Sequence, residues 1–265
     1  MNVTLLNPWQ GVDFGTVTGG RHYIHGLYGQ PLKTGLFIDK CEDVGRVADV
    51  HFWPFWKADA PTMVFTSKEA TAFRIGRADW EYMFNCFAIC HKIGYHFVRT
   101  PSGEPNVVLT QCGSDEGASG TRSISVQVDG NQAHAGISFV NGQFMGAPSI
   151  AIGTTNAGPV KFNNCGFWGG PLTDTIAQLD GAGHTTFIGC HFISWAQRDK
   201  QAPAIRLDRG SVTVDGCEFM DAGGRQVMLE KNAATAIILG NRFHGAARLG
   251  NKIGKRAKIM GNAAI

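Results

Sequence analysis

One short motif recurs six times in the second half of the chain, and it limits the possible folds more than any other feature. Each copy places a small residue before Gly, Cys or Asn, and all but the last end in Phe. The fourth residues of successive copies are 23, 25, 27, 24 and 21 residues apart. A period in the low to middle twenties predicts a solenoid, in which each repeat stacks on the one before it. The copies are FVNGQF from Phe139, FNNCGF from Phe162, FIGCHF from Phe187, VDGCEF from Val214, ILGNRF from Ile238 and IMGNAA from Ile259.

The composition of one repeat indicates which solenoid this is. A leucine-rich repeat has a similar period, but its L-x-x-L-x-L-x-x-N pattern and its helix are missing here. A parallel β-helix fits better, because each repeat carries short alternating strands separated by Gly, Asn and Asp. In one repeat, strands are expected at PVKF (159–162), CGFW (165–168) and IAQLD (176–180), with a tight corner at NN. Each coil is therefore expected to contain three strands.

Alternation along these strands assigns side chains to the inside or the outside of the coil. In CGFW, Cys165 and Phe167 point inward, and Gly166 and Trp168 point outward. The residues that recur are thus predicted to fill the core, which leaves function to the outward positions that do not recur. The predicted inner stacks are Cys165, Cys190 and Cys217, and Phe144, Phe167, Phe192, Phe219 and Phe243.

The N-terminal half follows the same scheme less regularly. Strands such as NVTLL, VADVHF and EYMF match the first strand of the later repeats, and GLFIDK and YHFVR match the third. This predicts a single all-β domain over residues 1–265, a right-handed parallel β-helix of about 10–11 coils with uncapped ends. Residues 57–72 are the longest departure and are predicted to be an inserted loop. Since an uncapped end exposes core and strand edges, we expect a module of a larger protein.

Composition and charge exclude several classes of protein. The 265 residues are 43% hydrophobic and 17% charged, which is typical of a globular chain. The net charge of +3 is spread without a block of like charges, so a nucleic-acid partner is not expected. No apolar run approaches the length that spans a membrane, and the N-terminus lacks the pattern of a signal peptide. The protein is expected to be either intracellular or, as we favour, an extracellular or periplasmic part of a larger exported chain.

The seven cysteines indicate neither a disulfide framework nor a zinc finger. Their number is odd, and the C-x₃-C of Cys86 and Cys90 has no second pair at zinc spacing. Because several of them follow the structural repeat, they are interpreted as small buried residues. No metal site is predicted from them.

The coils with their inner Cys/Asn ladder resemble the right-handed parallel β-helix of the pectate lyase superfamily. The stretch GLFIDKCEDVGRVADVHFWPFW (residues 35–56) is similar to stretches in carbohydrate-active members. The resemblance implies the fold and a polysaccharide ligand. Two known catalytic signatures are missing, the N-T-D, D-D, G-H-G and R-I-K set of polygalacturonases and the R-x-P-x-x-R motif of pectate lyases.

A column of carboxylates is the first candidate site. Asp180, Asp208 and Glu230 follow equivalent strands on three successive coils, and stacked strands lie about 4.8 Å apart. Neighbouring acids would suit a retaining glycosidase, and their repulsion would raise one pKa, as a general acid requires. Gln178 and Arg206 share this outward face and would hydrogen-bond to a sugar. The alternative is a solvated acidic face, offset by Arg206, Arg225 and Lys231.

Tryptophans supply the second candidate site. Sugar rings present C–H faces that pack on aromatic rings, so exposed Trp side chains on a flat sheet would form a glycan-binding platform. Loops that cover these rings, or their burial in the core, would remove the platform. The candidates are Trp168 and Trp195, Trp53, Phe55 and Trp56 from HFWPFW, and Trp80.

A third candidate group is acidic and lies in the early coils. Asp39, Asp79 and Glu81 are a second choice for catalytic acids, and Asp39 is expected to face outward on the same sheet as Asp180. Calcium is the one cofactor that such oxygen atoms could hold, although their spacing matches no calcium-binding loop.

Two functions from different classes fit this sequence. We favour a non-catalytic carbohydrate-binding module joined to a catalytic domain, because catalytic signatures are missing and aromatic residues occupy outward positions. The alternative is a glycoside hydrolase or polysaccharide lyase that uses the paired carboxylates, by analogy with the fold. The near-neutral charge argues against a strongly anionic ligand and points to a plant-type polymer such as xylan or β-glucan.

Overall fold

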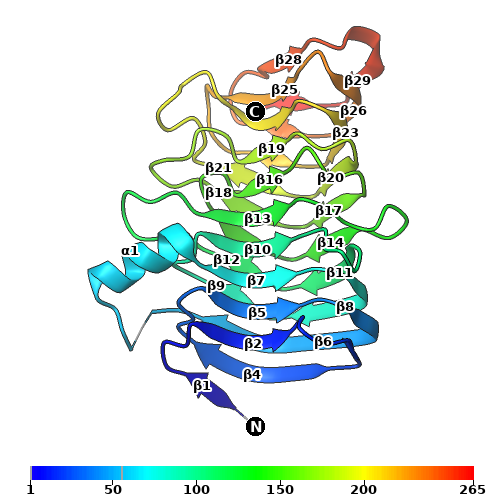
Figure 1. Ribbon diagram of the computed structural model, residues 1–265. Coiled ribbons are helices and arrows are strands. Elements are labelled where there is room, and N and C mark those ends of the chain that lie inside the picture. The colour runs from blue at the N-terminus through cyan, green and yellow to red at the C-terminus, as the bar shows by residue number, and fades with distance from the viewer. Residues whose placement is uncertain (1, 55) are drawn as a thin grey trace.

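The computed structural model describes residues 2–54 and 56–265, and these form a parallel β-helix of about 11 coils. The coils stack from the N-terminal end, blue in Figure 1, to the C-terminal end, red in the same view. The predicted all-β class, the solenoid and the number of coils are confirmed. Among the described residues, no helix is long and apolar enough to cross a membrane.

The strands form two parallel sheets that run the length of the stack. The ten-stranded sheet contains β2 (Gln10–Phe14), β5 (Thr34–Ile38), β7 (Thr71–Ile75), β10 (Ile93–Phe97), β13 (Ile124–Val128), β16 (Ile150–Ile152), β19 (Ala177–Leu179), β22 (Pro203–Leu207), β25 (Arg225–Leu229) and β28 (Leu249–Asn251).

The twenty-stranded sheet, called the bent sheet below, has a corner within each coil. Its strands before the corner are β3 (Gly19–Gly20), β4 (Tyr23–Gly29), β6 (Cys41–Phe52), β8 (Ala78–Phe84), β11 (Pro105–Thr110), β14 (Ile137–Val140), β17 (Val160–Asn163), β20 (His184–Ile188), β23 (Gly210–Asp215), β26 (Ala233–Leu239) and β29 (Ala257–Met260), of which β4 and β6 continue past it. Those after the corner are β1 (Val3–Leu5), β9 (Phe87–Ala88), β12 (Gly113–Ser114), β15 (Gln143–Met145), β18 (Gly166–Trp168), β21 (His191–Ile193), β24 (Glu218–Phe219), β27 (Arg242–Phe243) and β30 (Ala263–Ala264).

The corner of the bent sheet is a column of residues in the left-handed backbone region. Ten successive coils place a residue there with φ between 50° and 67°. Gly, Asn and Asp reach this conformation at the lowest cost, which explains the small residue of the repeat. From Asn85 to Gly240 the corner amides continue the ladder, as when the N–H of Asn164 donates to the carbonyl of Ile188 at 2.8 Å. The column is Gly26, Asp49, Asn85, Gln111, Asn141, Asn164, Gly189, Gly216, Gly240 and Gly261.

The hydrogen bonds of the residue after the corner explain why Cys or Asn occupies this position in most copies of the repeat. The thiol of Cys190 donates to the carbonyl of Phe162 on the preceding coil at 3.4 Å, and the amide of Asn241 donates to Val214 at 3.0 Å. Either side chain thus satisfies an inward-facing carbonyl, which a purely apolar residue would leave without this partner. All seven cysteines are free and buried, as the sequence predicts, but those in the ladder also act as donors.

Two stacks of phenylalanine rings fill the space between the sheets. Phe139, Phe162 and Phe187 stack with ring centroids 5.1 and 5.3 Å apart. The predicted second stack is also present, although its last pair is tilted by 55°. All of these rings are fully buried, and such burial stabilises each by about 1.5–3 kcal/mol. The second stack is Phe144, Phe167, Phe192, Phe219 and Phe243.

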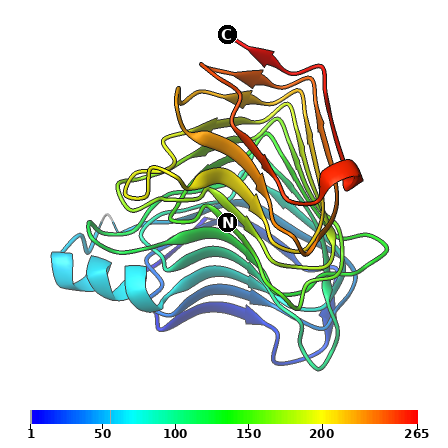
Figure 2. The same ribbon diagram turned by 90° about the horizontal axis from the view of Figure 1, so that it is seen from above.

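The prediction of a loop over residues 57–72 is wrong for most of that segment. Residues Ala60–Glu69 form the helix α1, which lies beside the stack in Figures 1 and 2. The carboxylate of Asp59 caps the helix by accepting from the N–H of Thr62, and Pro61 lies in the first turn. The last two residues of the segment already belong to β7. A ten-residue helix between β-coils has too short an apolar pattern to stand out in the sequence.

The corner column makes a direct prediction about stability. Asn164→Val should destabilise the protein by about 1–2 kcal/mol, because a β-branched side chain clashes in the left-handed region. Asn164→Gly should stay within about 1 kcal/mol of the parent, since the equivalent corners of the next coils are already glycine. Urea unfolding followed by circular dichroism measures both, and equal losses for the two variants would contradict the assigned role of the corner.

Candidate functional site

The predicted acid column lies at the end of three neighbouring strands of the ten-stranded sheet. Gln178 pairs with Arg206, and Arg206 with Met228, so these three outward residues form one row. Two positions after each residue of this row comes an acidic residue, just after β19, β22 and β25 end. These acids are Asp180, Asp208 and Glu230. Their inner neighbours are buried leucines that hold the strands in register. The predicted column is therefore present.

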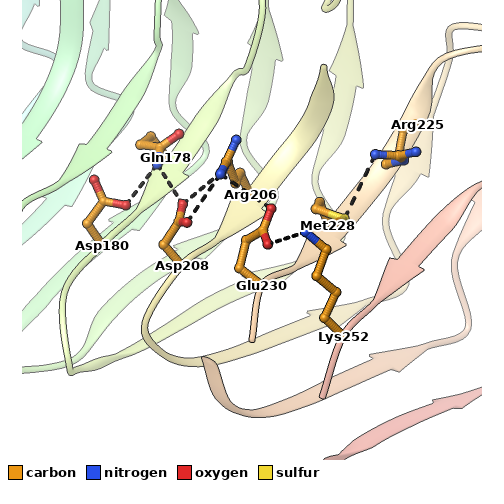
Figure 3. Close-up of polar contacts among 8 residues, drawn as sticks. All are labelled: Gln178, Asp180, Arg206, Asp208, Arg225, Met228, Glu230 and Lys252. Atoms are coloured by element: carbon orange, nitrogen blue, oxygen red, sulfur yellow. Dashed lines mark hydrogen bonds and ion pairs between the residues drawn. The ribbon is translucent and has the colours of Figure 1, made fainter. Parts of the chain in front are cut away.

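Figure 3 shows that donors alternate with the three carboxylates. The side-chain amide of Gln178 donates to both Asp180 and Asp208, each at 2.8 Å. The guanidinium of Arg206 donates to Asp208 at 2.9 Å and forms an ion pair with Glu230 at 3.3 Å. The carboxylates are thus joined into one network by neighbours on the same face.

The second cation of this network differs from the prediction. Lys252 forms an ion pair with Glu230 at 2.7 Å, whereas the guanidinium of Arg225 lies 3.9 Å from the sulfur of Met228. The register of β25 on β28 (Leu249–Asn251) brings Lys252 beside Glu230. Lys252 could have been identified from the sequence by aligning the outward positions of one more coil with those of Asp180, Asp208 and Glu230. The contribution of Arg206 is confirmed.

Contacts within this network shift the pKa values of Asp180 and Arg206. Burial raises the pKa of Asp180, and the negative charge of Asp208 raises it further, while the hydrogen bond from Gln178 opposes both effects. The hydrogen bond to Asp208 raises the pKa of Arg206, with Glu230 and Asp180 adding to the effect through their charges. Asp180 is therefore the member best suited to hold a proton.

A second polar group on the same sheet was not predicted. Asp129 occupies on β13 the place that Asp180 occupies on β19, two coils earlier. It accepts from His96 at 2.7 Å and from Gln127 at 3.1 Å, and the hydrogen bond with His96 lowers its pKa. The coil between the two groups carries only small residues on this face. It has alanine at the position equivalent to Gln178 and glycine at the position equivalent to Asp180. Following the column past those small residues would have revealed Asp129.

The tryptophans predicted to form one platform have different surroundings. Trp80 is 53% exposed, and Trp168 is half-buried. The exposure predicted for Trp195 is wrong, because its side chain is only 2% exposed. Its indole packs edge-on against Phe219 at 6.1 Å and lies against Gly224, where a side chain would collide with it.

The residues of HFWPFW cluster with one another instead of lying side by side on a flat surface. The ring centroids of Trp53 and Trp56 are 5.5 Å apart, and those of His51 and Trp53 are 4.2 Å apart. Trp53 and Trp56 are half-buried, and the indole N–H of Trp56 donates to Asn7 at 3.4 Å. Phe55, the other ring predicted here, lies outside the described residues.

The most exposed aromatic row lies on β8 of the bent sheet. Trp80, Tyr82 and Phe84 alternate along this strand and are 53%, 45% and 47% exposed. Tyr23 on β4 is 66% exposed. It occupies the position on its coil that Tyr82 occupies two coils later, and Arg46 occupies this position on the coil between them. Tyr82 and Phe84 were not predicted from the sequence, although the alternation in DWEYMF was the signal that could have found them.

The third predicted group does not assemble. Asp39 is buried, contrary to the prediction of an outward position, and accepts from the N–H of Arg77 at 2.7 Å and the hydroxyl of Thr100 at 2.9 Å. Asp79 pairs with Arg77 at 3.1 Å. Glu81 is buried against His22 at 3.1 Å. Asp39 and Asp79 thus share Arg77, one through its backbone N–H and the other through its guanidinium, whereas Glu81 contacts His22.

A different cluster surrounds Glu81. In the described part of the chain, His22, Cys41 and Glu81 are the only group of three or more His, Cys, Asp or Glu whose ligand atoms all lie within 4.8 Å of one another. Burial lowers the pKa of His22, but hydrogen bonds with Cys41 and Glu81 outweigh it and raise this pKa to about 9. The cluster is nearly closed to solvent.

Comparison of this chain with protein-family models, with curated proteins and with solved structures finds no match in any of the three. The parallel β-helix follows from the strand pairings described above. The link to the pectate lyase superfamily remains a prediction from the residues that resemble it.

The hydrogen bond between Gln178 and Asp180 predicts a measurable change in proton affinity. Gln178→Leu should raise the pKa of Asp180 further, because it removes the amide that stabilises the charged carboxylate. NMR titration of the side-chain carboxyl carbon measures this value. Gln127→Leu, at the equivalent position on β13, is the matched control and should leave the pKa of Asp180 unchanged. A fall in that pKa in Gln178→Leu would contradict the assignment.

Proposed function

We propose that this protein is a carbohydrate-binding β-helix and that Trp80, Tyr82 and Phe84 form its main contact with a polysaccharide. The observation that carries the proposal is the exposure of these three rings in one row on a flat sheet face. Successive outward side chains of a strand lie about 6.6 Å apart, so the rings are spaced regularly along one line. A regular line of apolar faces suits a polymer with a regular repeat.

The polar residues at the margin of this row support the same proposal. His25 pairs with Asp49 at 2.9 Å, and Asn85 donates to the same carboxylate at 2.7 Å. Asp49 and Asn85 are corner residues one coil apart, beside Phe84. Arg46 lies exposed beside Tyr82. Hydroxyl groups of a sugar would find donors and acceptors at the edge, while the ring faces meet the aromatic centre.

The ligand class follows from charge and shape. The protein is close to neutral overall, and the row presents rings rather than a cluster of cations, so a neutral chain fits better than a polyanion. Xylan and β-glucan are the first polymers to test. In this proposal the protein acts outside the cell or in the periplasm, as a module beside a catalytic domain that cuts the polymer.

The proposal predicts the loss of binding when the row is interrupted. Tyr82→Ala should reduce retention on insoluble xylan or β-glucan at least tenfold, because the central ring of the row is removed. A pull-down with quantified bound and free protein measures this effect. Ile237→Ala is the matched control, since Ile237 lies on the same face in β26 and is 46% exposed, against 45% for Tyr82.

Two outcomes would sink this proposal. One is the failure of the parent protein to be retained on any polymer of a broad polysaccharide panel. The other is an equal loss of retention in Tyr82→Ala and Ile237→Ala. Circular dichroism of both variants establishes that the coils remain folded, which is expected because both side chains point away from the core.

Glycoside hydrolysis is a second candidate function, and one observation favours it. The raised pKa of Asp180 suits a general acid, and the carboxylate of Asp208 lies close enough to contribute to that rise. A pocket of about 240 Å³ adjoins Gln178 and is also lined by Arg122 and Asp174. A sugar bound there would lie beside the network.

This second candidate predicts products. If it holds, the protein releases reducing ends from a polysaccharide, and Asp180→Asn lowers the rate at least a hundredfold because the proton donor is lost. Binding to the polymer stays intact in that variant, since Asp180 is far from the aromatic row in the fold. The absence of any released product from a polymer that the protein binds would exclude this function and leave the binding proposal in place.

A further inference from the structure

We infer that His22, Cys41 and Glu81 form a buried binding site for a zinc ion. This site is separate from the aromatic row and from the acid column. It was not predicted from the sequence, because its three residues are 19 and 40 positions apart and follow no metal-binding motif.

The coil geometry brings the three side chains together, one from each of three successive coils. His22 directly precedes β4, Cys41 begins β6, and Glu81 lies in β8. The strands β4 and β8 both pair with β6, which places His22 and Glu81 on either side of the middle coil. An ion held by all three would link the first three coils of this part of the stack.

The three side chains already contact one another. The sulfur of Cys41 lies 3.7 Å from Nδ1 of His22, and Nε2 of His22 lies 3.1 Å from Oε1 of Glu81. Because the two ring nitrogens face different partners, the imidazole must rotate so that one of them faces an ion shared with Cys41 and Glu81. One ligand atom of each residue lies within 4.8 Å of those of the other two. Bonds of about 2.0–2.3 Å in a tetrahedral site place neighbouring ligand atoms roughly 3.3–3.6 Å apart, so binding would draw the three side chains closer together.

An unpartnered atom points to a missing ligand. Oε2 of Glu81 is buried and has no hydrogen-bond partner, although the side chain of Glu81 is fully enclosed. A buried carboxylate oxygen without a partner is costly, and a cation would satisfy it. Gly45 allows both side chains to approach the backbone closely, because a Cβ at this position would lie 2.1 Å from Oε2 of Glu81 and 2.6 Å from Nε2 of His22.

The donor set selects the class of metal. Thiolate, imidazole and carboxylate together suit zinc, whereas calcium and magnesium prefer sites made of oxygen atoms. The ring of His22 stacks on Phe14 with centroids 5.1 Å apart, which gives the site an apolar wall. Because the three side chains are nearly closed to solvent and come from three coils, the ion would have a structural role in holding the early coils together.

Metal titration of the chelator-treated protein tests this inference. Under reducing conditions, Co²⁺ used as a probe should bind once per chain and produce a thiolate-to-cobalt charge-transfer band. Zn²⁺ should displace it and raise the thermal midpoint by several degrees. Cys41→Ser should lose the band, and Glu81→Gln should weaken binding at least tenfold.

Two further variants keep the test independent of folding defects. Cys190→Ser removes a buried ladder thiol that donates to the carbonyls of Phe162 and Ile188, far from the cluster in the stack, and should retain the band. Gly45→Ala keeps all three ligands but displaces the side chains of Glu81 and His22, and should weaken cobalt binding at least tenfold. The inference fails if the parent gives no band, or if the band persists in Cys41→Ser. Unchanged binding in Gly45→Ala would also overturn it.

Discussion

The whole molecule depends on the left-handed corner that each coil makes between the two arms of the bent sheet. At that corner the backbone turns without breaking the ladder, because its N–H still donates to the carbonyl of the next coil. Gly and Asn adopt the conformation readily, and the Cys or Asn that follows donates to the coil before it. Corner and donor together keep the coils in register, and this register stacks the phenylalanine rings.

Register also determines what the outer surface can do. Every outward position lies above its equivalent on the previous coil. Side chains at equivalent positions of successive coils therefore form a column. Acids in one column repel one another. The chain reduces this repulsion by placing Gln178 and Arg206 between the acids and Lys252 at the end of the column. On the bent sheet the same geometry leaves the rings of β8 exposed side by side. A solenoid therefore provides rows suited to extended ligands more readily than deep pockets.

The sequence was sufficient for the fold and for the direction of most strand residues, since period and alternation are local signals. It predicted the acid column and the pairing with Arg206 for the same reason. It failed where the path of a loop decides the outcome. Trp195 is buried against Gly224, and Asp39 is bound by Thr100, which is 61 residues away. Helix α1 was missed because ten residues carry too little periodicity.

The cluster of His22, Cys41 and Glu81 shows the same limit more sharply. None of its members is unusual in the sequence, and only the stacking of three coils makes them neighbours. Gly45 belongs to the cluster because it has no side chain where Glu81 and His22 pack against the backbone, and no motif records this. Contacts of this kind depend on the register between coils and on the enclosed space, neither of which is a property of any single segment.

The central claim is that the outward aromatic row of β8 binds a polysaccharide. A crystal structure of the protein with a xylan- or β-glucan-derived hexasaccharide tests it most directly. We expect sugar rings stacked on Trp80, Tyr82 and Phe84, with hydroxyl groups bonded to His25, Asp49 or Asn85 at the edge. A hexasaccharide found instead along Gln178 and Asp180 on the ten-stranded sheet, with the β8 row bare, would contradict it.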